Sequence, residues 1–160
     1  MRRELSKLLV ASTVILSVLL IPTALAVKPT DVSGTWSWTA DIISDRWANG
    51  NWFLLATEYD DLDGTFDGDG VGLFKVTVHS GGFLTGSGRT TFTGEVMGYE
   101  GTLVFQWTGT TKTLGKWHCK WVILSGTGEL ANLRGSGIGV ETAPDSYELE
   151  LSGKIHFDPS

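Results

Sequence analysis

The stretch YELELSGKIHF, Tyr147 to Phe157, alternates apolar and polar side chains along most of its length. Successive side chains of a β-strand point to opposite faces, so the pattern predicts a strand with one buried and one solvated face. The predicted buried face consists of Tyr147, Leu149, Leu151, Ile155 and Phe157. A strand that is buried on one face only is typical of an antiparallel sheet.

The rest of the chain divides into short runs of the same kind. It contains 21 glycines, and no window longer than about ten residues keeps the 3.6-residue apolar period of a helix. Turn signals such as Asn49-Gly50, Asp63-Gly64 and Gly81-Gly82 separate the runs. Eight strands are predicted, at residues 35–43, 52–59, 65–79, 83–96, 102–110, 116–124, 134–140 and 147–157.

Several of these strands have an apolar face rich in aromatic residues. Alternation places together Trp36, Trp38 and Ile42; Leu103, Phe105 and Trp107; and Trp117, Cys119, Trp121 and Ile123. With no helices to cover a second face, eight such strands are most simply closed into a barrel that is apolar inside. We therefore predict an all-β, closed, eight-stranded antiparallel up-and-down (meander) barrel, with a two-sheet sandwich as the alternative.

The first 26 residues have the layout of a secretory signal peptide. Arg2, Arg3 and Lys7 precede an uncharged run, and Pro22 and the sequence Ala24-Leu25-Ala26 follow it. Cleavage after Ala26 predicts an extracellular or cell-envelope protein; the alternative is a membrane tether formed by the uncleaved segment. Residues 27–33 are then a short linker, and residues 34–158 form a single barrel domain.

Charge and motif content exclude several functions. The formal net charge is −6, and the predicted signal peptide contains three of the basic residues and one acidic residue. Nucleic acid and, after cleavage, membrane surfaces are therefore not expected partners. The acidic stretch from Asp60 to Gly70 fits a turn better than a calcium loop, and the three histidines lack metal-ligand spacing. No catalytic residue, metal or cofactor is predicted, and the oligomeric state stays open.

A ligand site is predicted inside the barrel. Five of the seven tryptophans fall on inward faces, where large aromatic side chains either line a pocket or fill the core. The single cysteine, on the same face, is expected to pack as a small hydrophobe. The predicted ligand-binding residues are Trp36, Trp38, Phe105, Trp107, Trp117, Cys119 and Trp121.

The segment GTGELANLRGSG, Gly126 to Gly137, matches a dinucleotide-binding fingerprint only formally. That fingerprint requires a helix after the glycine turn, and glycines restart a strand pattern within a few residues. We interpret the segment as a turn in which Leu130 and Leu133 fold over the barrel end and Glu129 pairs with Arg134.

Three segments carry a resemblance to a known family: FTGEVMGYEGTLVFQWTGT (92–110), SGTGELANLRGSG (125–137) and YELELSG (147–153). Together they resemble a prokaryotic family of unknown function classed with the allene oxide cyclase barrels, of which plant dirigent proteins are more distant members. The resemblance covers residues 34–157 and implies an eight-stranded up-and-down barrel. The polar functional positions of the cyclases have no match here, and Trp107 stands where relatives often have histidine.

A shorter resemblance leads to the same architecture. The stretch Ser33-Gly34-Thr35-Trp36 looks like the G-x-W motif of lipocalin-type (calycin-like) barrels. The function that we predict is binding of a small apolar or aromatic molecule by an exported barrel without a catalytic motif. The alternatives are a cofactor-independent cyclase-like or isomerase-like enzyme, and a protein-interaction barrel with a filled core.

Overall fold

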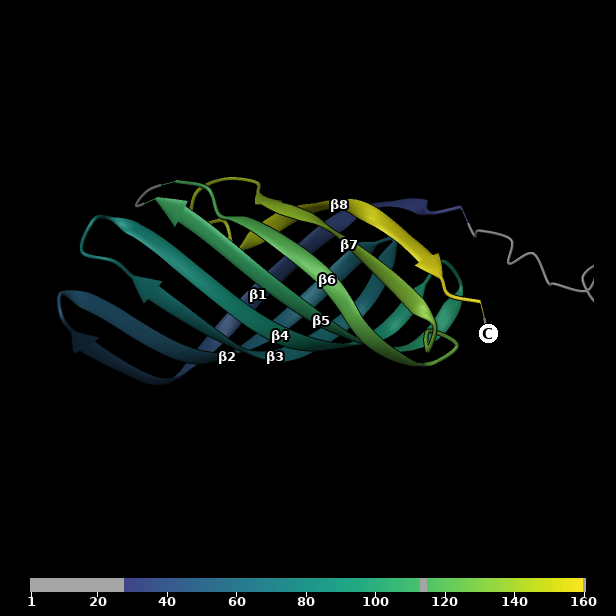
Figure 1. Ribbon diagram of the computed structural model, residues 1–160, viewed down its shortest axis with the longest axis horizontal. Coiled ribbons are helices and arrows are strands. Elements are labelled where there is room, and N and C mark those ends of the chain that lie inside the picture. The colour runs from purple at the N-terminus through teal and green to yellow at the C-terminus, as the bar shows by residue number, and fades with distance from the viewer. Residues whose placement is uncertain (1–27, 113–114, 160) are drawn as a thin grey trace, which may run out of the picture.

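Eight antiparallel strands follow one another around a ring in the order of the sequence (Figure 1). The computed structural model describes residues 28–112 and 115–159. Pairing of the first strand with the last completes the ring. This confirms the all-β meander, and a single continuous ring replaces the two separate sheets of a sandwich. The strands are β1 (Thr30–Ala48), β2 (Asn51–Gly64), β3 (Phe66–Val78), β4 (Phe83–Val96), β5 (Tyr99–Lys112), β6 (His118–Gly128), β7 (Leu133–Glu141) and β8 (Glu148–Phe157).

Each predicted strand exists, but several are longer than predicted. β1 begins at Thr30, inside the predicted linker 27–33, because Thr30 already pairs with Ile155 of β8. β3 pairs with both neighbours without a register shift, so its glycines do not form a bulge. The predicted signal peptide lies outside the described residues. No helix among the residues that the structure describes is long and apolar enough to cross a bilayer.

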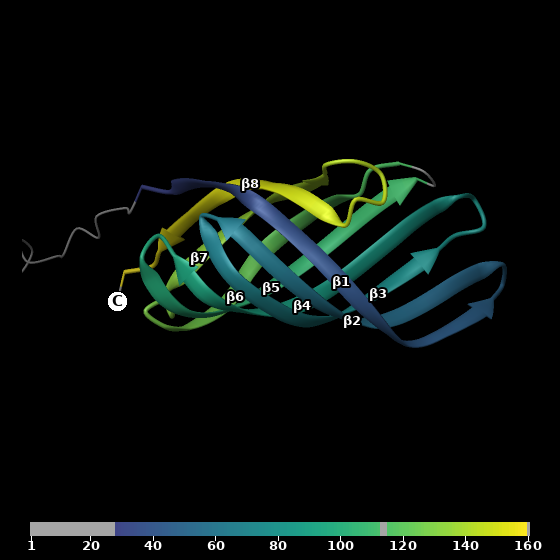
Figure 2. The ribbon, with the colours of Figure 1, turned by 180° about the vertical axis from the view of Figure 1, so that it is seen from behind.

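Strand alternation places the predicted faces correctly wherever the ring is complete. Leu149, Leu151 and Ile155 of β8 are buried, as expected, whereas Tyr147, predicted on the same buried face, precedes β8 and is 54% exposed. Ile42 lies on the inward side with its cross-strand partner Ala56, as predicted, but its side chain is 61% exposed. The reason is that β8 pairs with β1 only as far as Ser37, while the β1–β2 hairpin continues past the ring (Figures 1 and 2).

One half of the interior is filled by aromatic side chains. Phe105 lies at its centre, with ring centroids 5.2 Å from Phe66 and 5.9 Å from Trp36. Phe92 and Trp121 complete this packed cluster, at 6.1 and 6.0 Å from Phe105. Tilted and edge-on contacts of this kind add to the stabilisation from burying apolar area.

The segment between β6 and β7 closes the filled end, as predicted. Leu130 and Leu133 are fully buried, and the backbone N–H of Leu130 donates to the carbonyl of Thr127 in a tight turn. No helix follows Gly128 among the described residues, so the segment has no nucleotide-binding geometry.

The predicted pairing of Glu129 with Arg134 is wrong. Glu129 accepts a hydrogen bond from the backbone N–H of Glu100 at 3.0 Å. Arg134 lies 3.4 Å from Asp158 instead. The turn directs the two side chains to different neighbours, and both interactions tie this loop to adjacent parts of the rim.

Candidate functional site

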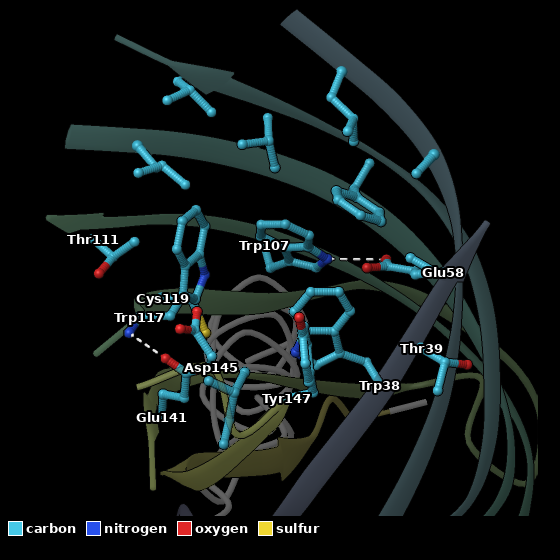
Figure 3. A pocket seen from close by; sticks show the side chains of 18 of the residues that line it. Trp38, Thr39, Glu58, Trp107, Thr111, Trp117, Cys119, Glu141, Asp145 and Tyr147 are labelled. Atoms are coloured by element: carbon cyan, nitrogen blue, oxygen red, sulfur yellow. Dashed lines mark hydrogen bonds between the residues drawn. The ribbon is translucent and has the colours of Figure 1, made fainter. Parts of the chain in front are cut away.

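A cavity of about 580 Å³ occupies the half of the interior opposite the buried loop of Leu130 (Figure 3). Its lining includes the exposed side chains of Ile42, Asp145 and Tyr147, so it opens to solvent at this end. A barrel of eight strands leaves room for one small ligand where large side chains do not fill it. The interior is therefore half filled and half hollow.

Five aromatic rings form a continuous wall of the cavity, the aromatic belt. Ring centroids are separated by 6.4 Å between Trp117 and Trp107, and by 6.0 Å between Trp107 and Phe74. The belt continues to Trp38, 5.9 Å from Phe74, and to Tyr147, 5.0 Å from Trp38. β1, β3, β5 and the segments before β6 and β8 contribute one ring each. The belt gives the cavity flat apolar surfaces.

The seven predicted ligand-binding residues divide between the two halves. Phe105 and Trp121 belong to the packed cluster and do not line the cavity, because they lie deeper along their strands. Five of the seven line the cavity: Trp36, Trp38, Trp107, Trp117 and Cys119.

A glutamate stands at the inner end of the cavity. Glu58 of β2 is only 3% exposed, and its carboxylate points inward (Figure 3). Oε1 of Glu58 accepts a hydrogen bond from the indole N–H of Trp107 at 3.0 Å and a second from the Thr90 hydroxyl. Burial raises the pKa of Glu58, and these two hydrogen bonds oppose the rise.

A second carboxyl, that of Asp60, lies beside Glu58 on the same face of β2. Asp60 is 5% exposed, and no described residue offers either of its oxygens a hydrogen bond of good geometry. Burial, together with the nearby Glu58 carboxylate, raises the pKa of Asp60 to about 7. The side chains of Trp36 and Thr90 lie close enough to oppose this rise in part. Asp60 is thus a buried acid that titrates near neutral pH.

Glycines of β3 make room for the two acids. Gly72 lies opposite Glu58 and Gly70 opposite Asp60 in the antiparallel register. A Cβ at Gly72 would come within 2.7 Å of Glu58 Oε1, and one at Gly70 within 2.9 Å of Asp60 Oδ2. Both distances are too short for real contacts, so the GDGVG sequence provides space for the carboxyls rather than a metal loop.

Neither acid was predicted as a site residue. The inward residues of β2 have even numbers: Leu54, Ala56, Glu58, Asp60 and Leu62. In the sequence, the two acids could have been assigned to the inward face because they are spaced by two residues from each other and from the apolar Leu62. This pattern was hidden because the outward positions of β2 carry apolar residues too, Phe53, Leu55 and Tyr59 among them.

Two further acids lie around the cavity. Glu141 at the end of β7 accepts a hydrogen bond from the backbone N–H of Trp117 at 2.9 Å and fixes that segment of the wall (Figure 3). Asp145, in the connection to β8, lies at the mouth. Glu141 therefore positions the belt, while Asp145 adds negative charge where a ligand would enter.

Cys119 and His79 pack or form hydrogen bonds within the fold. Cys119 is buried, and burial raises the pKa of its thiol to about 11, which disfavours the nucleophilic thiolate. His79 is hydrogen bonded to Thr85 and stacked on Phe83. Within the described part of the chain, no group of three potential ligands is arranged to hold a metal ion.

The fold and the site define an all-β ring of eight meander strands with an aromatic, acid-containing cavity at one end. The chain belongs to the DUF3224 family, described as a protein family of unknown function, whose profile matches residues 37–151. A crystal structure of a DUF3224 protein of unknown function from Shewanella oneidensis MR-1 is similar, with a TM-score of 0.69 at 17% identity. The alignment covers 83% of this chain and 100% of that one. No curated protein matches the chain.

Proposed function

We propose that this protein binds a small apolar or aromatic molecule in the cavity. The observation that carries the proposal is the aromatic belt around an open volume of about 580 Å³. Pockets for small molecules are mostly apolar, with a few polar groups that set the ligand's orientation. The indole N–H groups of Trp38 and Trp117 make no hydrogen bond to any described residue and supply such groups.

Two further predictions belong to this proposal. If residues 1–26 direct export, the ligand is met outside the cytoplasm or in the cell envelope. The allene oxide cyclase-like type of barrel, suggested by the sequence resemblance, agrees with the meander order of the strands. A protein-interaction barrel with a filled core fits less well, since the interior is filled in only one half.

Contact quenching of tryptophan fluorescence tests the proposal. We expect para-bromobenzyl alcohol to quench the fluorescence saturably, because bromine quenches indoles that it touches and several tryptophans surround the cavity. Val76 lines the cavity from β3, so Val76→Phe should reduce the quenching by filling the volume. Fluorescence titration of the folded protein provides the measurement.

The matched control is Thr77→Phe, which adds the same ring on the opposite face of the same strand. It should leave the quenching curve unchanged. Equal saturable quenching in the wild type and Val76→Phe would place the binding outside the cavity. Absence of saturable quenching across a panel of apolar compounds would also contradict the proposal.

A second candidate function is that of a cofactor-independent isomerase or cyclase. The observation that favours it is the inward pair of carboxyls, Glu58 and Asp60. An ionised Glu58 can take a proton from a carbon next to a substrate carbonyl and return it to another carbon. No other reactant is required for that exchange.

Deuterium exchange tests this candidate. In D₂O, the protein should accelerate deuterium incorporation into an enolisable aryl ketone such as phenylacetone, and Glu58→Gln should remove the acceleration. Proton NMR measures the loss of the exchanging signal. Exchange at the rate of buffer alone across a series of such ketones would leave binding as the function.

A further inference from the structure

We propose that the ligand carries a protonated amine on its aromatic or apolar body and that this ammonium group binds the free oxygen of Glu58. The inference rests on the proposed function, since it specifies the ligand class of the same cavity. Its support comes from the charge of the lining, the geometry of Glu58 and the faces of the tryptophans.

The charge of the cavity lining has one sign. Three carboxyl side chains, those of Glu58, Glu141 and Asp145, line the cavity from its inner end to its mouth. No lysine, arginine or histidine occurs among the described residues of the lining. An anionic ligand would be repelled throughout, whereas a cation is favoured at each depth of the cavity.

The geometry of Glu58 leaves one oxygen for a ligand. Both hydrogen bonds to its carboxylate, from Trp107 and Thr90, end on Oε1. Oε2 accepts no hydrogen bond from a described residue, although the side chain is almost fully buried and points into the cavity (Figure 3). Among the described residues, only the two oxygens of Asp60 are both fully buried and without a hydrogen-bond partner, so Oε2 of Glu58 is accessible from the cavity. An N–H donor on a ligand can therefore reach it and form a charge-assisted hydrogen bond.

The tryptophans add a second attraction for a cation. The edges and faces of Trp38, Trp107 and Trp117 surround the same volume as the Glu58 carboxylate. The face of an indole ring attracts an ammonium group, and the attraction is strongest when water is excluded. Aromatic faces together with a carboxylate form a recognition site for an amine, whereas a neutral apolar ligand would use only the rings.

No basic group lines the cavity around Glu58 among the described residues. Its cross-strand neighbours Ala40 and Gly72 carry no charge. Asp60 on the same strand and Cys119 on β6 interact electrostatically with Glu58, and Glu141 on β7 lies elsewhere in the cavity lining; none of the three becomes positively charged. Because burial raises the pKa of Glu58, an ammonium group should bind more tightly as pH rises and Glu58 ionises. Binding of a neutral ligand should lack this dependence.

Three para-bromophenyl compounds of similar size test the inference by calorimetric titration of the intact protein. We expect the affinity for para-bromobenzylamine to exceed that for para-bromobenzyl alcohol by about tenfold or more, because only the amine forms a charge-assisted hydrogen bond with Glu58. para-Bromobenzoate should bind more weakly than both. Glu58→Gln should bring the affinities of amine and alcohol together, because the amide is neutral.

A second variant protects the test against misfolding of Glu58→Gln. Asp145 is exposed at the mouth, so Asp145→Asn should fold and should weaken the amine by about twofold without affecting the alcohol. Equal affinities for amine and alcohol in the wild type would overturn the inference and leave the proposed function standing. Binding of none of the three compounds would overturn the proposed function itself.

Discussion

Replacement of Asp60 by asparagine should stabilise the protein above neutral pH. The pKa of Asp60 is raised to about 7 in the folded chain from 3.8, so folding favours its protonated form. The stability that this group contributes is present below pH 4 and is lost as pH rises toward 7. The loss amounts to about 4 kcal/mol at most. Asp60→Asn, which cannot ionise, should raise the melting temperature at about pH 8 by several degrees.

At about pH 4, where Asp60 is protonated in the folded chain, Asp60→Asn should melt close to the wild type. The matched control is Asp61→Asn, which changes the neighbouring but exposed carboxyl and should have little effect at either pH. Thermal unfolding of the three proteins across this pH range provides the comparison. A lower melting temperature for Asp60→Asn than for the wild type at about pH 8 would contradict the description of Asp60 as a buried carboxylate that lacks hydrogen-bond partners.

Truncation of Phe105 to alanine should cost about 3–5 kcal/mol of unfolding free energy. Its ring is 1% exposed and touches four other rings of the packed cluster, so removal leaves a void that the rigid ring of strands cannot close. Denaturant unfolding would measure the difference. Ligand quenching in any folded fraction should persist, because Phe105 does not line the cavity.

The same truncation in the aromatic belt should behave differently. Tyr147 is 54% exposed at the mouth, so Tyr147→Ala should cost about 1 kcal/mol or less while weakening the binding of aromatic probes. Comparable losses of stability for Tyr147→Ala and Phe105→Ala would contradict the division of the interior into a filled and a hollow half.

The strands could be predicted because each has one buried face in a complete ring. Two-residue periodicity was sufficient for β8, where Leu149, Leu151 and Ile155 are all buried. It also assigned Ile42 to the inward face, and Ile42 lines the cavity. The side chain is nevertheless exposed, because β1 leaves its partner β8 at Ser37 while β1 and β2 continue. Alternation assigns the face on which a residue lies. Whether that face is buried depends on where the neighbouring strands end, which the local sequence does not show.

The candidate site could be predicted only in part. The inward tryptophans were found, but their division between cavity and packed cluster depends on depth along the barrel, which the strand register determines. Glu58 and Asp60 were missed since acids are normally solvated and since Phe53, Leu55 and Tyr59 make the outer face of β2 equally apolar. Their burial depends on glycines in a different strand.

Because the ring has an even number of antiparallel strands, the first strand begins and the last strand ends at the same end of the ring. β1 begins and β8 ends at the filled end of the ring, where Thr30 pairs with Ile155 (Figure 1). The cavity opens at the other end. A surface, bead or fused domain joined next to Thr30 or Phe157 would therefore hold the ring of strands with its mouth directed outward. Immobilisation at these strand ends should leave the route into the cavity unobstructed.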